Sequence, residues 1–419
     1  MQKWGDSCIL FCTMLKEIEV REALELLLDV PVKLDIEPVE IGEALGRVAA
    51  EGVTAAIPLP PFDRSPFDGY AFRGEDTAAA SREEPVTLAV RQEIPAGHLP
   101  KEAVVSGQAA KILTGAPIPP GADAVVKFED TEFTKTSVTF FSPAAPGKNI
   151  VRAGEDIPEG TEMIPSGGLI EPAVMGFLAA QGLGYVNVYR RPLVSVINTG
   201  SELIEPGQPL PPGMIYNSSM FTLRGYLTKM GAGFRDGGIV DDDEAAIAAR
   251  VRAELATSDM VVTTGGASVG DYDCAMAAAK RAGADILFWK IKIRPGGSLL
   301  AYTLGGKLVL ALSGNPGAAV LGLLLLGAPC IRKRRGLTEV MPEECIVRLA
   351  GDMKKSSPRT RIMRGSLSIR DGEAFFVENA GQGGGDISSL VGCDLLAVIP
   401  AGSPPLPAGT CVKAYRVFE

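Results

Sequence analysis

Histidine is almost missing from this chain of 419 residues, which contains only His98. A catalytic triad centred on histidine, a zinc ion held by histidines and a histidine general base are therefore not expected. Acid–base chemistry must instead use carboxylates, lysine, tyrosine or a water bound to a metal ion.

Cysteine occurs in an odd number and without any C-x-x-C pair. The seven cysteines are scattered along the chain, at positions 8, 12, 274, 330, 345, 393 and 411. This pattern is typical of reduced cytosolic thiols and argues against a disulfide framework or a zinc site. We therefore expect a cytoplasmic protein.

The sequence also lacks an excess of positive charge and a long uninterrupted apolar run. Its 41 Lys and Arg residues are outnumbered by 50 Asp and Glu residues, which argues against nucleic acid as a partner. The longest apolar run, 317–331, contains Pro329 and is too short to span a membrane, so we expect a buried helix.

The N-terminal run CILFCTML has only Lys3 before it and lacks a small-residue cleavage site. We expect no signal peptide, and residues 1–13 to be an extra leader ahead of Met14.

The length of the chain exceeds what one hydrophobic core accommodates, so two to four domains are expected. Periodicity predicts helices at 17–28, 40–52 and 169–181, and a β-rich stretch to about residue 142 with strands at 85–90 and 137–141. Strands followed by helices are predicted from 190 to 333, at 193–198, 235–240, 260–264, 286–293 and 307–312. This pattern indicates an αβα layered sheet, and from residue 341 onward a small β-domain follows.

The stretch MVVTTGGASVGDYD, residues 260–273, combines a buried strand, a glycine pair and two aspartates. Gly265 and Gly266 release the backbone into conformations that a Cβ opposes, and Gly270 permits a close approach before a helix near Asp273. Backbone N–H groups in such a turn suit a phosphate, and nearby carboxylates suit a divalent cation. A purely structural βα turn remains the alternative, because the stretch is neither a P-loop nor a dinucleotide fingerprint.

Two further strands end in loops of the same kind. KLVLALSGNP, residues 307–316, carries Asn315, and PLVSVINTGSEL, residues 192–203, carries Glu202. In a parallel sheet these three strand ends line one rim, which is where α/β proteins bind ligands.

Asp241, Asp242 and Asp243 follow the strand that ends at Val240. One interpretation is capping of the next helix, where carboxylates meet free N–H groups. The other is that one of them joins Asp271 or Asp273 around Mg²⁺, a hard ion that favours carboxylate and phosphate oxygens.

Basic and apolar residues alternate in FWKIKIR, residues 288–294, which directs Lys290, Lys292 and Arg294 to one face of a strand. This face is either simply solvated or a platform for phosphate or another oxyanion. Asp68 in FDRSPFDGYAFR and Thr114 in ILTGAPIP each precede a glycine in a tight turn, and each alone suggests a structural role.

Together, eight motifs occur in the order and spacing of the molybdopterin molybdenumtransferase (MoeA) family, which includes the gephyrin E domain. They are FDRSPFDGYAFR, ILTGAPIPPGADAVV, VRAGEDI, NTGSELIEPG, IYNSS, TTGGASVGDYD, FWKIKIRPG and SGNPGAA. The chain resembles this family from Met14 to Glu419.

The resemblance implies a multidomain α/β fold: domain I at 14–53 plus 146–189 is α+β, and domain II, inserted at 54–145, is β-rich. Domain III at 190–335 is the αβα layer that holds the pterin nucleotide, and domain IV at 336–419 is β-barrel-like. The family forms homodimers in which domain II of the other subunit helps close the cleft. It hydrolyses adenylyl-molybdopterin with Mg²⁺ and molybdate, giving molybdenum cofactor and AMP. A molybdopterin adenylyltransferase is the implied upstream partner.

By motif match, the resemblance assigns catalytic roles to five residues: Asp68, Glu202, Asp242, Asp273 and Lys290. Among these, Asp242 and Asp273 match the positions associated with Mg²⁺. It assigns substrate binding to eight further residues: Thr114, Asp156, Gly265, Gly266, Ser268, Arg294, Asn315 and Arg364. Glu202 or Asp68 would orient water or pterin, and the motifs do not choose between these roles.

The sequence departs from the family on the oxyanion side of the site. Gly297 stands in RPGGS where K-P-G-K-P is usual, Gly384 ends Q-G-G where Q-G-S is usual, and Arg64 replaces a common Asn. Losing a charged donor costs about 1.5–3 kcal/mol, a tenfold to hundredfold weakening. We expect weaker or differently selective oxyanion use, including tungstate. A scaffold that binds pterin nucleotide without insertion and a nucleotide pyrophosphatase-like enzyme are the rival interpretations.

Overall fold

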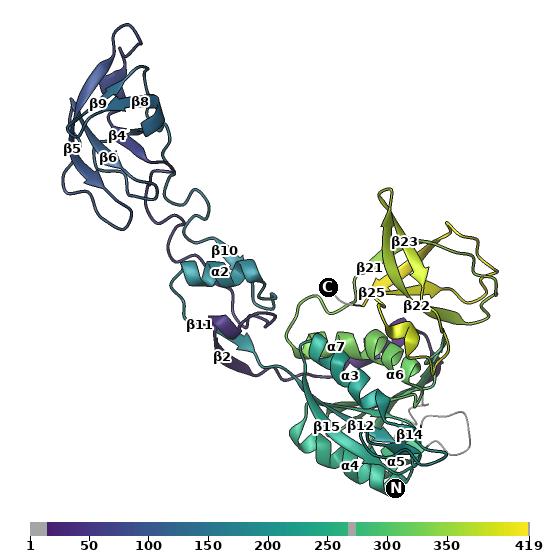
Figure 1. Cartoon of the computed structure of the whole chain (residues 1–419). Helices are drawn as coiled ribbons and strands as arrows, with labels where there is room; N and C mark the ends of the chain where they lie inside the picture. The colour runs from purple at the N-terminus through teal and green to yellow at the C-terminus, as the bar shows by residue number, and fades with distance from the viewer. Residues whose placement is uncertain (1–14, 267–273, 418–419) are drawn as a thin grey trace, which may run out of the picture.

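The computed structural model describes residues 15–266 and 274–417 of the chain. Figure 1 shows an extended molecule: a β-rich domain at one end is joined by a slender middle domain to a layered α/β domain, and a β-domain lies beside the latter. Ser268, Asp271 and Asp273, which the sequence singles out, lie outside the described residues.

A seven-stranded sheet forms the centre of the layered domain, in the order β1-β17-β19-β20-β16-β12-β15. Its strands are β1 (Leu15–Ile18), β12 (Leu193–Thr199), β15 (Gly233–Val240), β16 (Met260–Thr264), β17 (Asp285–Ile291), β19 (Leu300–Leu304) and β20 (Lys307–Leu312). Four neighbours, β20, β16, β12 and β15, run parallel, whereas β19 is antiparallel to both of its neighbours. The inner strands β16 and β20 are buried because helices cover both faces of the sheet, whereas β15, at its edge, carries the exposed Arg235 and Asp236.

Two helical layers enclose this sheet, which confirms the predicted αβα arrangement. One face is covered by α1 (Val20–Asp29), α3 (Ser218–Lys229) and a long helix made of α6 (Pro316–Gly322), the π-helical segment η4 (Leu323–Gly327) and α7 (Ala328–Arg334). The other face is covered by α4 (Glu244–Thr257) and α5 (Cys274–Ala282). The long helix is apolar enough to cross a membrane, but 83% of its most apolar window is buried inside the protein. The prediction of a buried helix there is confirmed.

The first strand and helix, which lie within the segment 14–53 that is predicted to belong to domain I, pack on this sheet. Strand β1 pairs with β17 in parallel, and Ile18, Leu24 and Leu27 pack into the main core of the layered domain. The amphipathic pattern predicted α1 but carried no information about which core its apolar stripe would cover.

The middle domain consists of short elements: β2 (Ile36–Glu40) with β11 (Tyr185–Tyr189), β3 (Val53–Thr54) with β10 (Glu162–Ile164), and α2 (Pro172–Ala180). The helix predicted at 40–52 is wrong, because only a 3₁₀ turn, η1 (Ile41–Glu43), forms there. Gly46 takes a φ of +69°, and the N–H groups of Gly46 and Ala49 bond to Ile170 and Gly168 across the domain instead of one helical turn back. The segment 40–52 therefore pairs with another extended segment of the middle domain instead of forming a helix.

The end domain is a six-stranded sheet in the order β7-β4-β6-β5-β9-β8. Its elements are β4 (Gly69–Phe72), η2 (Gly74–Thr77), β5 (Val86–Ile94), β6 (Gln108–Ile112), β7 (Ala124–Lys127), η3 (Phe128–Asp130), β8 (Thr131–Phe133) and β9 (Ser137–Phe140). The predicted β-rich character of this region is confirmed.

The C-terminal domain is a small closed barrel, as predicted. Its ring runs β22-β23-β21-β25-β24 and closes by pairing of β24 with β22. The elements are β21 (Glu344–Leu349), β22 (Thr360–Arg370), β23 (Glu373–Glu378), η5 (Ser388–Leu390), β24 (Leu395–Ile399) and β25 (Cys411–Arg416). Strand β18 (Ile293–Arg294) leaves the layered domain to pair with β22, so the two domains share backbone hydrogen bonds. The remaining short pair, β13 (Leu203–Ile204) with β14 (Ile215–Tyr216), lies at the sheet rim.

Gly265 is the tightest backbone approach at that rim. Its φ is +97°, and a Cβ added there would lie 2.2 Å from the carbonyl oxygen of Thr199. Gly265→Ala is therefore expected to destabilise the layered domain by about 2–4 kcal/mol, from backbone strain plus the collision. Urea unfolding followed by Trp289 fluorescence, in a Trp4→Phe background, measures this loss.

Gly283→Ala is the matched control, because Gly283 has a φ of +72° but nothing within 4 Å of an added Cβ. It should cost only the conformational strain, about 1–2 kcal/mol. Equal losses for the two variants would contradict the close approach at Gly265.

Candidate functional site

A cleft of about 390 Å³ opens at the rim where the parallel strands end. It is lined by residues that follow strands β12, β15, β16 and β20 or begin helices α3 and α6. They are Asn198, Thr199, Glu202, Leu203, Ile215, Tyr216, Asn217, Ser218, Ser219, Asp242, Thr264, Gly265, Gly266, Ser298, Ser313, Gly314, Asn315 and Pro316. The predicted rim of three small-residue loops is therefore present, and Glu202, Asp242, Gly265, Gly266 and Asn315 meet in one cleft.

Small residues allow the loops to converge. A Cβ on Gly314 would lie 3.3 Å from the Cα of Gly265, so the ends of β20 and β16 are almost in backbone contact. The amide of Asn198 donates to the hydroxyl of Thr264, which ties β12 to β16 beneath the cleft. Two helices, α3 and α6, begin at the cleft, and the positive ends of their dipoles favour a negatively charged ligand. In α6, Pro316 has no N–H and the N–H of Ala318 donates to the carbonyl of Gly384.

Three of the lining side chains carry buried polar atoms without a hydrogen-bond partner in the described structure. They are Oδ1 of Asn198, Oγ1 of Thr199 and Nδ2 of Asn217. Such atoms are costly unless a ligand, an ion or a water satisfies them. None of these three residues was predicted from the sequence as a site residue. Asn217 can be recognised as the cap of α3, where its side chain accepts a hydrogen bond from the N–H of Met220 at 3.3 Å.

The charge of the cleft is negative. Among its described lining residues, Glu202 and Asp242 are the charged ones, and no lysine or arginine joins them. An anionic ligand held there by backbone N–H groups would need a cation between itself and the two carboxylates. Carboxylate and phosphate oxygens are the ligands that Mg²⁺ prefers. The described residues contain no group of three or more side chains that could hold a metal ion, so Glu202 and Asp242 fit Mg²⁺ only together with phosphate oxygens of the ligand.

The aspartate triplet divides its roles. Asp243 caps α4 by accepting from the N–H of Ala246 at 2.7 Å, so the capping interpretation is confirmed for this residue. Asp242 faces the cleft instead. The thiol of Cys274, at the start of α5, lies 3.7 Å from the carbonyl oxygen of Asp242, which brings the beginning of that helix beside the triplet.

Beside the cleft, the barrel domain contributes a buried arginine. Arg364 is fully buried and donates to the carbonyl of Gly383 at 2.8 Å, while its Nε and Nη1 have no partner among the described residues. Burial is the main cause that lowers its pKa, because a charged guanidinium loses its hydration there. A Cβ on Gly317 would lie 2.3 Å from Nη1, so a glycine at the start of α6 admits this side chain.

The two glycines that depart from the family pattern, Gly297 and Gly384, differ in how much room a side chain would have. A Cβ on Gly297 would lie 2.6 Å from the carbonyl oxygens of both Ile291 and Ile293, so the loop is folded tightly around a glycine. A Cβ on Gly384 would meet Ala318 and Asn315 at 3.6 Å, which is ordinary contact.

The basic strand predicted at 288–294 is wrong as a single platform. The backbone turns at Lys290, whose φ is +66°, and the strand divides into β17 and β18. Lys290 lies over the ring of Trp289, Lys292 pairs with Glu19 at 3.1 Å, and Arg294 is exposed at the edge of the barrel. The cleft lining includes Ser298 from this segment but neither Lys290 nor Arg294.

The remaining predicted residues lie far from the cleft within one chain. Asp68 and Thr114 meet in the end domain, where one carboxylate oxygen accepts from both the N–H and the hydroxyl of Thr114 at 2.7 Å. Asp156 is exposed in the connection between the end and middle domains. Figure 1 shows the end domain well separated from the layered domain.

The two hydrogen bonds from Thr114 are the main cause that lowers the pKa of Asp68. We predict that Thr114→Val, which removes the hydroxyl donor, raises the pKa of Asp68 toward its ordinary value. Because the pKa is lowered in the folded state, this interaction stabilises the fold above the unfolded pKa and is lost as the pH falls through the folded value.

Carboxyl ¹³C chemical shifts of Asp-labelled protein, followed during an acid titration, measure this change. Thr139→Val is the control, because Thr139 bonds to Thr87 in the same domain and not to Asp68. An Asp68 titration that is the same in both variants would contradict the prediction.

Three family models match successive parts of the chain. Residues 18–182 match the MoeA N-terminal region, which comprises domains I and II, and residues 195–333 match a probable molybdopterin binding domain. Residues 347–417 match the MoeA C-terminal region, domain IV.

Relatives and solved structures agree with these models over nearly the whole chain. Molybdopterin molybdenumtransferases of Staphylococcus aureus (strain COL) and Staphylococcus epidermidis (strain ATCC 12228) are each 33% identical to it, covering 94% of both chains. A crystal structure of the molybdopterin biosynthesis MoeA protein from Pyrococcus horikoshii OT3 superposes with a TM-score of 0.81 at 32% identity, covering 96% of this chain and all of that one. The chain therefore belongs to the molybdopterin molybdenumtransferase family, whose members are transferases of molybdenum cofactor biosynthesis.

Proposed function

We propose that this chain inserts molybdenum into molybdopterin by Mg²⁺-dependent hydrolysis of adenylyl-molybdopterin in the presence of molybdate, with release of AMP. The single observation that carries the proposal is the rim cleft, in which two carboxylates face loops rich in backbone N–H groups. A phosphoanhydride is the kind of ligand that needs both features, and membership of the family provides the reaction.

The chain's own groups divide the work in this proposal. The N–H groups near Gly265 and Gly266, together with the N-termini of α3 and α6, hold phosphate oxygens. Asp242 holds Mg²⁺ with Asp273, and Glu202 orients the water that attacks phosphorus. Bound Mg²⁺ supplies polarisation of the anhydride, so that a histidine base is not needed.

The proposal extends to the oxyanion corner beside the cleft. Arg364 is positioned there as a cation whose free N–H groups suit molybdate, which is a substrate and not a resident metal. Lys290 and Arg294 act at the entrance in this scheme, because they lie outside the lining of the cleft. Ser268 completes the phosphate-facing loop.

We further propose a cytoplasmic homodimer supplied with substrate by a molybdopterin adenylyltransferase. The Asp68–Thr114 pair of the end domain and Asp156, in the connection to the middle domain, then act on the cleft of the other subunit. The support for this arrangement is their distance from the cleft of their own chain, together with the two hydrogen bonds from Thr114 that hold Asp68 in its charged form.

The oxyanion corner favours a second candidate, in which tungstate replaces molybdate or insertion is lost and binding remains. Its support is the pair of glycines at 297 and 384, which lack the amine and hydroxyl that the family usually places there. The two candidates differ in whether AMP release depends on molybdate, on tungstate or on neither, and this dependence can be measured directly.

The decisive assay supplies adenylyl-molybdopterin and Mg²⁺ with molybdate, tungstate or neither, and measures AMP and the metal content of the product. We predict AMP release that requires an oxyanion, and a decrease of about 10- to 100-fold for Asp242→Asn from the loss of one charged ligand. Asp241→Asn is the control, because this neighbour does not line the cleft. AMP release that ignores oxyanions would indicate a pyrophosphatase, and tight binding without turnover would indicate a scaffold.

The two glycine positions should respond differently to restoration of the family residues. Gly384→Ser is expected to fold normally and to strengthen molybdate use by about 2- to 10-fold, the contribution of one hydrogen bond. Gly384→Ala, which adds the Cβ without the hydroxyl, should show no gain. Gly297→Lys should instead disrupt its loop, because the carbonyls of Ile291 and Ile293 occupy the space of its Cβ.

The apparent molybdate affinity from the AMP assay and the unfolding midpoint of each variant measure these effects. A Gly384→Ser enzyme no better than Gly384→Ala would show that position 384 does not contact the oxyanion.

A further inference from the structure

A second cavity, of about 490 Å³, lies at the opposite edge of the central sheet, where the parallel strands begin. It is lined by the residues that precede β12 and β16, by the hairpin before β20, by the end of α7 and by the linker after α1. They are Pro31, Val32, Lys33, Asp35, Arg190, Pro192, Asp259, Gly305, Gly306, Lys307 and Arg334. Both chain connections between the layered and middle domains, 30–35 and 190–192, border this hinge cavity.

The charges of the hinge cavity are not balanced. Four cations, Lys33, Arg190, Lys307 and Arg334, face two carboxylates, Asp35 and Asp259. This local excess of positive charge is found in a chain whose net charge is −9. A concave site of one sign with low-dielectric walls concentrates ions of the opposite sign.

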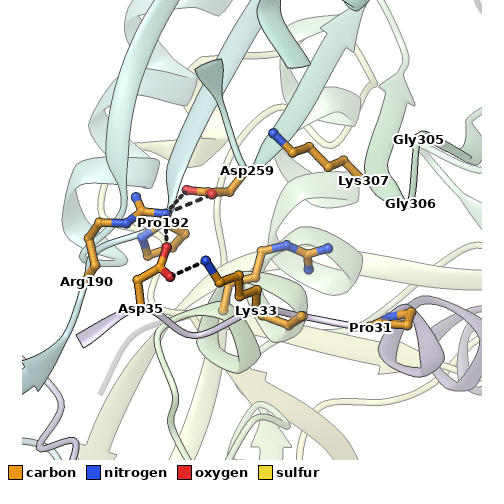
Figure 2. A pocket seen from close by; sticks show the side chains of 11 residues that line it. Pro31, Lys33, Asp35, Arg190, Pro192, Asp259, Gly305, Gly306 and Lys307 are labelled. Atoms are coloured by element: carbon orange, nitrogen blue, oxygen red, sulfur yellow. Dashed lines mark hydrogen bonds and ion pairs between the residues drawn. The ribbon is translucent and has the colours of Figure 1, made fainter. Parts of the chain in front are cut away.

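The two carboxylates are already engaged by two of the cations. One guanidinium nitrogen of Arg190 contacts both oxygens of Asp259, at 2.9 and 3.1 Å, and lies 3.6 Å from Asp35. Lys33 pairs with Asp35 at 2.9 Å. Figure 2 shows these contacts as one connected group, with Lys307 apart from it.

The other two cations form no direct ion pair among the described residues, although the charge of Asp259 is close enough to act on Arg334. Lys307 donates to the carbonyls of Leu255 and Ser258 at 2.6 and 2.8 Å, which leaves its third N–H available. Arg334 is only 6% exposed and donates to the carbonyl of Cys330 at 3.1 Å. Within the described ranges, 15–266 and 274–417, it forms no ion pair, and burial is the main cause that lowers its pKa.

A buried guanidinium without a direct ion pair is costly, and the C-terminal end of α7 and the more distant Asp259, which is already bonded to Arg190, offset only part of that cost. From the buried Arg334, the free donor of Lys307 and the open volume between them, we propose that the hinge cavity binds a small phosphate-bearing anion. The phosphate oxygens would accept from Arg334 and Lys307, and Lys33 would add a third positive charge at the entrance. The cavity exceeds the size of a phosphate ion, so the natural ligand is an organic phosphate.

Such a ligand would also brace the hinge. Lys33 belongs to the linker that leads into the middle domain, whereas Lys307 and Arg334 belong to the layered domain. An anion held by all three side chains would fix the position of one linker against the sheet. The site is independent of the proposed chemistry, because it lies at the edge of the sheet opposite the rim cleft.

Thermal unfolding of the full-length chain in phosphate and in chloride buffers of equal ionic strength tests the proposal. Phosphate at ten times its dissociation constant should raise the ratio of folded to unfolded protein about 11-fold, whereas chloride should not. Arg334→Met should abolish this response and be at least as stable as the parent in chloride, because it removes a buried charge that forms no direct ion pair. A merely structural Arg334 would instead leave this variant destabilised in both buffers.

Lys33→Ala keeps the test decisive if Arg334→Met folds poorly, because the side chain of Lys33 is 88% exposed. It should raise the dissociation constant for phosphate about 3- to 10-fold without changing stability in chloride. Lys413→Ala is the control, because Lys413 is also paired with a carboxylate, Glu344, but lies in the barrel. The proposal is overturned if phosphate acts no differently from chloride, or if its effect is undiminished in Arg334→Met or in Lys33→Ala.

Discussion

The close approach of Gly265 to the carbonyl of Thr199 sets the geometry on which the rim cleft depends. Because no side chain separates the ends of β12 and β16, the loops that follow them can converge, and Gly314 brings the end of β20 to the same point. The residues that line the cleft then come from the following positions in each loop, namely Glu202, Gly266 and Asn315. Wider strand ends would leave the same residues around an open surface, where water competes for every hydrogen bond.

The sequence predicted the parts of the fold that depend on local pattern. Strands β12, β16 and β20 are buried runs rich in apolar residues and followed within two residues by glycine, and such runs are typical of a sheet covered on both faces. The spacing of residues 40–52 misled because Gly42 and Gly46 favour turns over a helix, and the apolar side chains pack between extended segments. Residues 288–294 were predicted to form one continuous strand, because the alternation of basic and apolar residues does not indicate the left-handed backbone conformation at Lys290.

The sites were less predictable than the elements, since they depend on contacts between segments far apart in sequence. Asp68 meets Thr114 because β4 and β6 pair antiparallel with Gly69 opposite Ile112. Asp68 lies one position before Gly69, and Thr114 lies two positions after Ile112. Neither turn motif predicts this register of strand pairing. Arg364 was found only through its family motif, because a buried arginine in a β-strand has no distinguishing pattern. The hinge cavity left no sequence signal at all, since its lining residues come from five separate segments.

One helix connects the two edges of the central sheet. It runs from Pro316, in the lining of the rim cleft, through the π-helical segment to Arg334, in the lining of the hinge cavity. At 1.5 Å per residue its 19 residues span about 28 Å. Its dipole places partial positive charge at the cleft, where the lining side chains are acidic, and partial negative charge near Arg334. The carboxylates of the cleft and the arginine of the hinge cavity are thus both stabilised by the helix ends they face. Each nevertheless carries more charge than a half-unit dipole can balance, so both edges favour a bound ion of opposite sign.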